Sequence, residues 1–152
     1  MANTYTQIFI HVVFSVQDRE RIIPQSISER INKYISGIIH KRGSKVYSIN
    51  AMPDHVHILL SLNPDDSLSE LIKEVKRCAT VFIKDNKLMP FSFQWQKGYG
   101  AFSCSKSSIS AVCKYIKNQE LHHKRKTFRE EYVELLEKYE VEYDKAYIFQ
   151  EV

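Results

Sequence analysis

Two histidines separated by one residue are the first feature of this chain that could do chemistry. His55 and His57 lie in the sequence MPDHVHILL at residues 52–60. In an extended strand, side chains two positions apart project from the same face, so this spacing predicts that both imidazoles point together. Two imidazoles on one face form half of a metal site, and a complete site needs donors from elsewhere in the chain. A pair at this spacing also arises by chance among six histidines.

A tyrosine, a glutamine and a histidine form a second candidate group, on a helix predicted over residues 105–124. Tyr115, Gln119 and His122 follow at intervals of four and three residues, so they form one stripe at about 100° per residue. The apolar stripe expected to face the core consists of Ile109, Val112, Cys113 and Ile116. Without further evidence, Tyr115 is one of nine tyrosines and Gln119 is an ordinary surface amide.

Basic and aromatic residues mark two places where a nucleic acid could bind. A helix predicted from residue 67 to about residue 84 carries cations away from its apolar side, and the loop WQKGY at residues 95–99 carries two aromatic rings. Cationic side chains can follow a phosphate backbone, and aromatic rings can stack on bases. The candidate nucleic-acid-binding residues are Lys73, Lys76, Arg77, Trp95, Lys97 and Tyr99. The structural alternatives are a solvated helix face for the cations and a core position for Trp95.

Composition indicates one globular domain. The 152 residues are 43% hydrophobic and 26% charged, which is ordinary for such a chain. We expect a single domain over residues 1–152, with a core at about residues 6–136 and a C-terminal tail at residues 137–152. The chain lacks an apolar run of membrane-spanning length and the pattern of a signal peptide, which predicts a cytoplasmic protein with no membrane partner.

The cysteines and the net charge exclude some classes of protein and permit others. Cys78, Cys104 and Cys113 are odd in number and far apart, and no Cys-x-x-Cys occurs. This pattern argues against a disulfide framework and against a zinc ribbon. The net charge of +4 permits a polyanionic partner without requiring one.

The candidate residues depend on an alternation of predicted strands and helices. Alternating apolar residues predict strands over residues 6–16, 45–51, 55–62 and 91–95. Apolar residues three and four positions apart predict a first helix over residues 26–43 and a last helix over residues 128–139. The order predicts an α+β fold of the ferredoxin-like or RRM-like plan. In this plan an antiparallel sheet has helices on one face and leaves the other for a ligand, and C-terminal helices follow.

Three motifs in this order closely resemble one protein family. They are MPDHVHILL at residues 52–60, WQKGY at residues 95–99, and YIKNQ at residues 115–119 followed by His122, His123 and Phe128. The chain thereby resembles the single-tyrosine HUH transposases of the insertion-sequence-200 class (TnpA-like), over about residues 6–136. The histidine triplet alone is a weak signal, whereas the three motifs together are specific.

The resemblance implies a mechanism and a set of site residues. His55, His57 and Gln119 would bind a divalent metal, Mg²⁺ or Mn²⁺, which acts as a Lewis acid on the scissile phosphodiester. Tyr115 would be the catalytic nucleophile and would form a 5′-phosphotyrosine intermediate. The substrate would be single-stranded DNA with subterminal hairpins. The protein would be a homodimer, as in family members that exchange the catalytic helix between subunits.

Several alternatives remain open at this point. His122 or His123 could replace Gln119 as the third metal ligand. Asp54 is expected to cap a turn rather than to bind metal. The chain could be a non-catalytic hairpin-binding module, or a metal-dependent phosphodiesterase that uses water in place of Tyr115.

Overall fold

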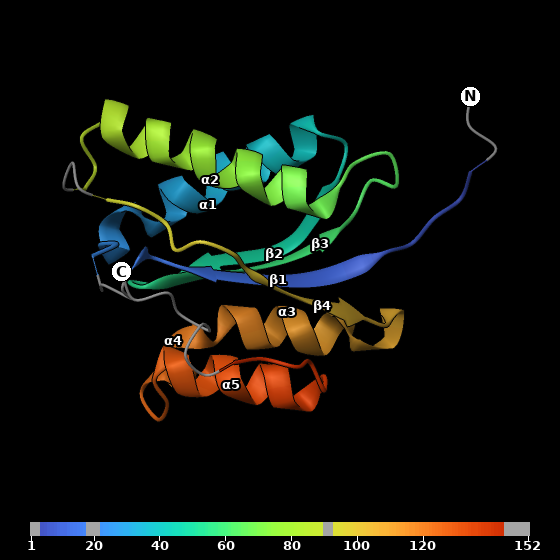
Figure 1. The fold of residues 1–152 in the computed structure, drawn as a ribbon. Helices are drawn as coiled ribbons and strands as arrows, with labels where there is room; N and C mark the ends of the chain where they lie inside the picture. Colours follow the sequence, from blue (N-terminus) through green and yellow to red (C-terminus); the bar gives the residue numbers. More distant parts are fainter. Residues whose placement is uncertain (1–3, 18–21, 90–92, 145–152) are drawn as a thin grey trace.

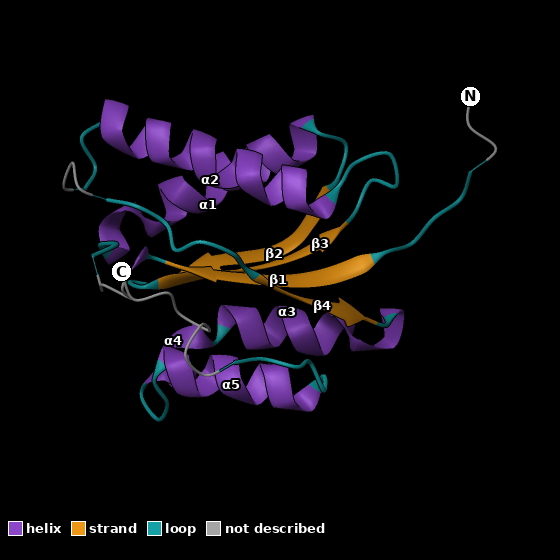
Figure 2. Cartoon of the chain, viewed as in Figure 1, coloured by secondary structure: helices purple, strands orange, loops and turns teal. Residues whose placement is uncertain are grey.

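The computed structural model describes residues 4–17, 22–89 and 93–144, which form a four-stranded sheet between two helical layers (Figure 1). The strands are β1 (Phe9–Ser15), β2 (Lys45–Ala51), β3 (His55–Ser61) and β4 (Gly100–Cys104). They are antiparallel neighbours in the order β2-β3-β1-β4 (Figure 2). The predicted α+β fold with an antiparallel sheet is confirmed.

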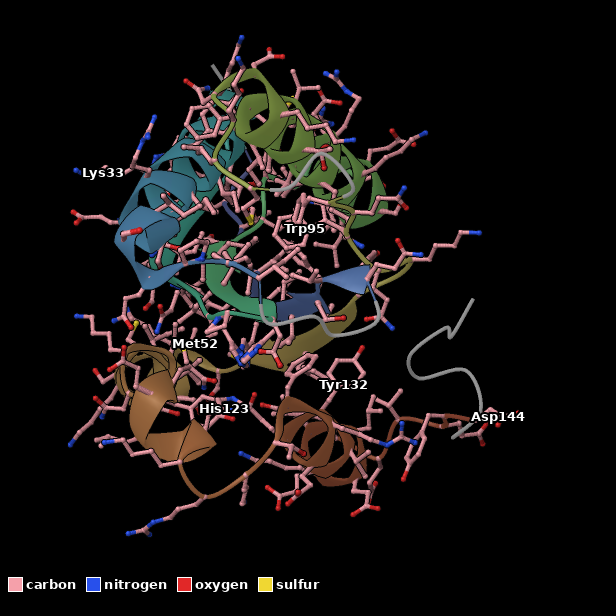
Figure 3. All side chains as sticks on the ribbon, turned by 90° about the vertical axis from the view of Figure 1, so that its left-hand side faces the viewer. Lys33, Met52, Trp95, His123, Tyr132 and Asp144 are labelled. Atoms are coloured by element: carbon pink, nitrogen blue, oxygen red, sulfur yellow. The ribbon has the colours of Figure 1, made fainter. Side chains whose placement is uncertain are left out.

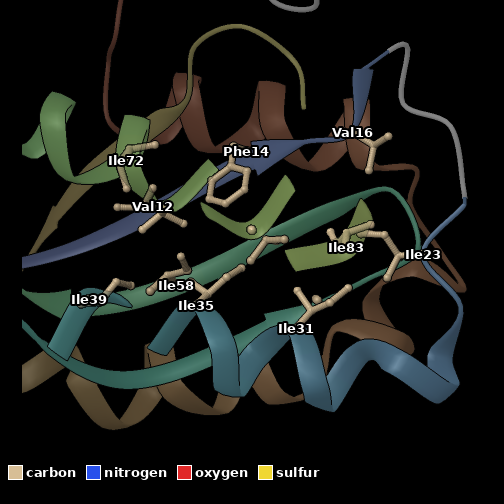
Figure 4. Packing of buried hydrophobic residues seen from close by; sticks show 14 of the residues in the cluster. Val12, Phe14, Val16, Ile23, Ile31, Ile35, Ile39, Ile58, Ile72 and Ile83 are labelled. Atoms are coloured by element: carbon tan, nitrogen blue, oxygen red, sulfur yellow. The ribbon is translucent and has the colours of Figure 1, made fainter. Parts of the chain in front are cut away.

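Helices α1 (Gln25–Lys41) and α2 (Leu68–Asp85) cover one face of the sheet. Ser67 caps α2, because its side chain accepts a hydrogen bond from the backbone N–H of Glu70. The layer between these helices and the sheet is apolar (Figure 4). Its fully buried side chains include Val12, Phe14, Ile31, Ile35, Ile58, Leu60, Leu71 and Ile83.

Three C-terminal helices cover the opposite face, which the sequence-based prediction leaves open for a ligand (Figure 1). The helix predicted over residues 105–124 is divided into a 3₁₀ turn (Lys106–Ser108), α3 (Ile109–Lys117) and α4 (Gln119–His123). Asn118 ends α3 with a backbone ψ of 22°. Ile116 is the only member of the predicted apolar stripe that is buried. The other three members of the stripe are partly exposed.

The position of the fourth strand was predicted wrongly. Phe91 lies outside the described residues, Phe93 is a core side chain, and Trp95 forms only an isolated bridge with Val16. The true β4 pairs with β1 from Gly100 to Cys104. Its sequence, GAFSC, is poor in branched residues, so pairing with β1 rather than local preference determines this strand.

Helix α5 (Phe128–Lys138) folds back under the sheet and begins at Thr127, whose hydroxyl accepts a hydrogen bond from the Glu130 N–H. It joins a second apolar cluster that contains Val13, Phe102, Phe128 and Leu136. The contact is close, because a Cβ built on Gly100 would lie 2.8 Å from the hydroxyl oxygen of Tyr132. Helix α5 is therefore packed into the domain.

Two further predictions concern the ends of the chain and the membrane. The predicted tail at residues 137–152 is described only as far as residue 144, so the rest of that prediction lies outside the described residues. Among the described residues, every helix is too short or too polar to cross a membrane.

Candidate active site

Strand β3 presents the two histidines to the face that α3, α4 and α5 cover. His55 and His57 are fully buried, and they pair in register with Ser15 and Val13 of β1. Their neighbour Ile58 belongs to the apolar core on the opposite face. One strand thus separates a polar interior from an apolar one.

Five side chains bring nitrogen and oxygen donors together beneath the sheet. The Gln119 Oε1 atom lies 3.3 Å from His55 Nε2 and 2.9 Å from His123 Nε2. The Glu131 Oε1 atom lies 3.0 Å from His57 Nε2, 3.1 Å from His123 Nε2 and 3.7 Å from His55 Nε2. The ligand atoms of His55, His57, His123 and Glu131 all lie within 4.8 Å of one another. We call these five residues the donor cluster.

The predicted nucleophile lies beside the donor cluster in the same chain. The Tyr115 hydroxyl donates a hydrogen bond to Glu131 Oε2, while the other carboxylate oxygen faces the histidines. The Tyr115 ring meets the His57 ring edge-on, with centroids 5.8 Å apart. A cavity of about 360 Å³ between α3 and α5 reaches Tyr115 and Glu131. A single chain therefore gathers the phenol, both strand imidazoles and the amide.

Outer hydrogen bonds orient the two strand histidines. His55 Nδ1 lies 2.6 Å from Asp54 Oδ1, and His57 Nδ1 lies 2.8 Å from His11 Nε2. Both contacts direct the Nε2 atoms toward the donor cluster, as such contacts do in metal sites. Burial, with a smaller effect from His57, lowers the pKa of His11 to about 3, so His11 is neutral. Asp54 contacts His55 and does not join the donor cluster.

The negative charge of the Glu131 carboxylate affects the pKa values of its neighbours. Although burial alone would raise its pKa, hydrogen bonds from His123 and His57 hold the pKa of Glu131 well below its usual range. Burial, and next the charge of Glu131, raise the pKa of Tyr115 far above that of a free phenol. Burial works to lower the pKa of His123, but its hydrogen bond to Glu131 and the charge there outweigh this and raise it. Glu131 is therefore ionised, and burial together with the charge of Glu131 keeps Tyr115 protonated.

Two members of the donor cluster, His123 and Glu131, were not among the metal ligands that the family resemblance implied. His123 was considered only as an alternative ligand, and Glu131 was missed entirely. His122 belongs to α4, but its side chain is outside the described part of the chain. A signal for Glu131 was present, since it lies three residues after Phe128 and five before Leu136, within the buried face of α5. A carboxylate on an apolar stripe indicates a partner inside the fold.

The six candidate nucleic-acid-binding residues line one pocket of about 560 Å³ between α2 and the loop at residues 94–99. The side chains of Lys73, Arg77 and Lys97 are exposed there. Arg77 is paired with Glu74 through a contact of 2.6 Å. We call this the basic pocket.

Two of the six residues, Lys76 and Trp95, make contacts that fix the position of the loop at residues 94–99. The Lys76 ammonium donates to the backbone carbonyls of Gln96, at 2.9 Å, and Gly98, and burial lowers the pKa of Lys76 to about 8. Trp95 packs edge-on against Phe14, with ring centroids 5.0 Å apart, which agrees with the core alternative. In Figure 3, Trp95 lies on the α2 side of the sheet, whereas His123 and Tyr132 lie on the other side.

The donor cluster fits a divalent metal chemically. Imidazole nitrogens, a carboxylate oxygen and an amide oxygen are all ordinary metal ligands. The side chains of His55, His57 and Gln119 are fully buried, and Glu131 is 3% exposed. Buried charges occur in proteins when they are paired or when they coordinate metals.

A family model and several known proteins match this chain. The model of the IS200-like transposases matches residues 4–119. The ISDra2 transposase TnpA of Deinococcus radiodurans is 24% identical over 118 residues, which cover 74% of this chain and 84% of that protein.

Solved structures share the fold. A Deinococcus radiodurans protein assigned as a transposase matches with a TM-score of 0.62 at 18% identity, over 78% of this chain and 95% of that one. A REP-associated tyrosine transposase bound to a REP hairpin matches with a TM-score of 0.57 at 16% identity, over 81% of this chain and 73% of that one.

Proposed function

Because this chain belongs to the IS200-like transposases, we propose that it cuts and rejoins single-stranded DNA by transesterification through Tyr115. The observation that carries the proposal is the position of the Tyr115 hydroxyl, which donates to the carboxylate of Glu131. The same carboxylate contacts His57, beside the contact between His55 and Gln119. A nucleophile beside a buried set of metal ligands is the arrangement that metal-assisted phosphoryl transfer requires.

The residues divide the work of cleavage. His55, His57 and Gln119 would hold Mg²⁺ or Mn²⁺. This ion would supply Lewis acidity toward the scissile phosphate and a positive charge that favours the phenolate form of the tyrosine. Tyr115 Oη attacks phosphorus, and the bond from phosphorus to the 3′ oxygen breaks. The 5′ phosphate remains on Tyr115, the phenol proton passes from Oη to its hydrogen-bond acceptor, Glu131 Oε2, and the departing 3′ oxygen takes up a proton to become a 3′-hydroxyl.

Rejoining follows from the kind of bond that is formed. The phosphotyrosine ester conserves the energy of the phosphodiester, so a 3′-hydroxyl of a DNA end can attack it and release Tyr115. No nucleoside triphosphate is needed. This distinguishes the proposed reaction from hydrolysis, in which water would end the reaction with a free 5′ phosphate.

We extend hairpin recognition to this chain from its structural neighbour, which is bound to a REP hairpin. The basic pocket supports this part of the proposal, because Lys73, Arg77 and Lys97 expose cations beside the ring of Tyr99. The loop at residues 96–99 also lines a second cavity, of about 260 Å³, with Phe128 and Tyr132 of α5. One loop thus connects the basic pocket to the helix that carries Glu131.

The test is a search for covalent product. We would incubate the protein with hairpin-containing single-stranded DNA and Mn²⁺ or Mg²⁺, and separate the products on a denaturing gel. The proposal predicts a protein–DNA adduct that Tyr115→Phe abolishes. Tyr34→Phe is the matched control, because Tyr34 stacks on Phe82, within the α1–α2 layer. Cleavage that survives Tyr115→Phe would indicate a hydrolase, and binding without cleavage would indicate the non-catalytic hairpin-binding module.

A homodimer in which each chain builds its own site is also part of the proposal. Since Tyr115 and the donor cluster meet within one chain, a mixture of Tyr115→Phe and His57→Ala proteins should form no adduct. Adduct formation by the mixture would mean that two subunits share each site. The association state itself is measured by light scattering on the wild-type protein.

A further inference from the structure

Helix α5 brings a carboxylate into the site from beyond the stretch that matches the family model. The match ends at residue 119, whereas His123 and Glu131 follow it. Glu131 is nevertheless the centre of the donor cluster, because its carboxylate contacts His57, His123 and Tyr115. The mechanism proposed above uses Glu131 only as a hydrogen-bond acceptor, so its position among the imidazoles needs its own explanation.

Four of the separations within the donor cluster are close to those of neighbouring ligands in a coordination shell, and the His55 Nε2 to Glu131 Oε1 separation, at 3.7 Å, is wider. Ligand atoms bound about 2.1 Å from one ion lie about 3.0–3.4 Å apart when their angles are tetrahedral or octahedral. Glu131 Oε1 lies 3.0 and 3.1 Å from the Nε2 atoms of His57 and His123. Gln119 Oε1 lies 3.3 and 2.9 Å from those of His55 and His123.

We propose that Glu131 and His123 are resident ligands of the same ion as His55, His57 and Gln119, so that ion binding and the docking of α5 are linked. This inference rests on the metal dependence in the proposed function and deepens it. The ion then has three imidazoles, one carboxylate and one amide, compared with the two imidazoles and one amide that the family resemblance implies.

The enlarged ligand set selects among metals. Mg²⁺ prefers an octahedral shell of oxygen atoms and retains much of its water, whereas imidazole-rich sites favour first-row transition ions. Three imidazoles, of which those of His55 and His57 are fully buried, therefore favour Mn²⁺ over Mg²⁺, and Co²⁺ or Zn²⁺ over both. With five protein donors, an octahedral ion keeps one position for a phosphate oxygen.

The same carboxylate connects the ion to the nucleophile. Glu131 Oε1 faces the imidazoles and Oε2 accepts the hydrogen bond from Tyr115, so α5 holds both halves of the site together. The apolar contacts of Phe128 and Leu136 with the sheet dock α5 from either side of Glu131. An ion bound by Glu131 would add to these contacts and stabilise the docked helix.

The experiment measures Mn²⁺ binding without DNA, by titration calorimetry on the full chain. We expect Glu131→Gln to weaken Mn²⁺ binding by at least about tenfold, and His123→Asn to do the same. Glu134→Gln is the matched control, since it removes a carboxylate one turn along the same helix, where it pairs with Lys126 at the surface. Its affinity should remain within about twofold of wild type, and wild type should bind Mn²⁺ at least about tenfold more tightly than Mg²⁺.

A second readout uses the wild-type protein alone. Hydrogen exchange on the wild-type protein should slow in α5 when Mn²⁺ is added, with no change in α1. Unchanged exchange in α5, or Mn²⁺ affinity unaffected by Glu131→Gln, would overturn the inference. Equal affinity for Mg²⁺ and Mn²⁺ would overturn the assignment of the metal class.

The outcome is separable from that of the proposed function. If wild type forms the Tyr115 adduct while Glu131→Gln binds Mn²⁺ normally, the function stands and this inference fails. If Glu131→Gln loses Mn²⁺ binding while wild type forms no adduct, this inference stands and the function fails.

Discussion

The two faces of the sheet bury different kinds of side chain. The α1–α2 face buries an apolar cluster, whereas the α3–α5 face buries His55, His57, Gln119 and Glu131 beside a smaller apolar cluster. Burial of apolar area stabilises a fold, while buried polar groups at best balance their loss of hydration. The comparison indicates that one face supplies stability and the other supplies chemistry. Adjacent residues of β3, His57 and Ile58, are both fully buried and test this division directly.

The largest expected effect is on activity, from His57→Ala. Because His57 offers Nε2 to the donor cluster, its loss should lower the rate of adduct formation by at least about a hundredfold. The chain should still fold, since the α1–α2 core is untouched, which circular dichroism would check. A variant that forms adduct at the wild-type rate would contradict the role of the α3–α5 face.

The converse change is Ile58→Ala. Ile58 follows His57 in β3 and faces the α1–α2 layer. Removing a fully buried isoleucine side chain should lower the free energy of unfolding by about 3 kcal/mol, measured in urea. Adduct formation at low temperature should stay within about twofold of wild type, because no donor moves. Loss of adduct in a folded Ile58→Ala protein would mean that the two faces are not independent.

A bound metal ion should stabilise the protein through the donor cluster on the α3–α5 face. A ligand that binds the folded state alone, at a hundred times its dissociation constant, adds about 2.7 kcal/mol to the free energy of unfolding. We expect Mn²⁺ to raise the unfolding temperature of wild type and EDTA to reverse this. At the same Mn²⁺ concentration His57→Ala should show a smaller rise, because one ligand of the ion is lost, while Ile58→Ala should show the full increment from its lower baseline. Equal increments in both variants would place the ion elsewhere.

The smallest expected effect concerns an ion pair on the α1–α2 side. Arg42 binds Asp66 with contacts of 2.6 and 2.8 Å, and the pKa of Asp66 is thereby lowered. Because the unfolded chain takes up the proton at a higher pH, the stabilisation is complete above the ordinary pKa of aspartate. It is lost as the pH falls through the lowered value.

In Asp66→Asn, the free energy of unfolding should therefore fall less between neutral and acid pH than it does in the wild type. This difference should be much smaller than the effect of Ile58→Ala, because ion pairs at the surface contribute little to stability. Urea unfolding at neutral pH and at about pH 3 measures this, with the exposed Asp65→Asn as control. A similar change in both variants would exclude the pair as the cause.

The two faces also differ in how well the sequence predicts them. Helices α1 and α2 and strands β2 and β3 have a regular apolar spacing, and their predicted bounds lie close to the observed ones. Periodicity is informative here because one side of each element faces an apolar layer. Tyr115 and Gln119 were identified by motif resemblance, and the fold brings them to the histidine pair.

The α3–α5 face could not be predicted in the same way. Strand β4 depends on its pairing with β1, and the break at Asn118 depends on how α3 and α4 meet the sheet. Glu131 acquires its partners only when α5 folds back, so spacing along the chain does not reveal its contact with His57. Long-range contacts determine these features, and local sequence patterns do not encode them.

The most direct test of the account is to identify the residue that carries the DNA. After the reaction with hairpin-containing single-stranded DNA, the adduct would be digested with nuclease and protease and analysed by mass spectrometry. The account predicts a 5′-phosphonucleotide on the peptide that contains Tyr115, attached to the phenol oxygen. Attachment to another residue, or cut DNA with no attached peptide, would contradict it.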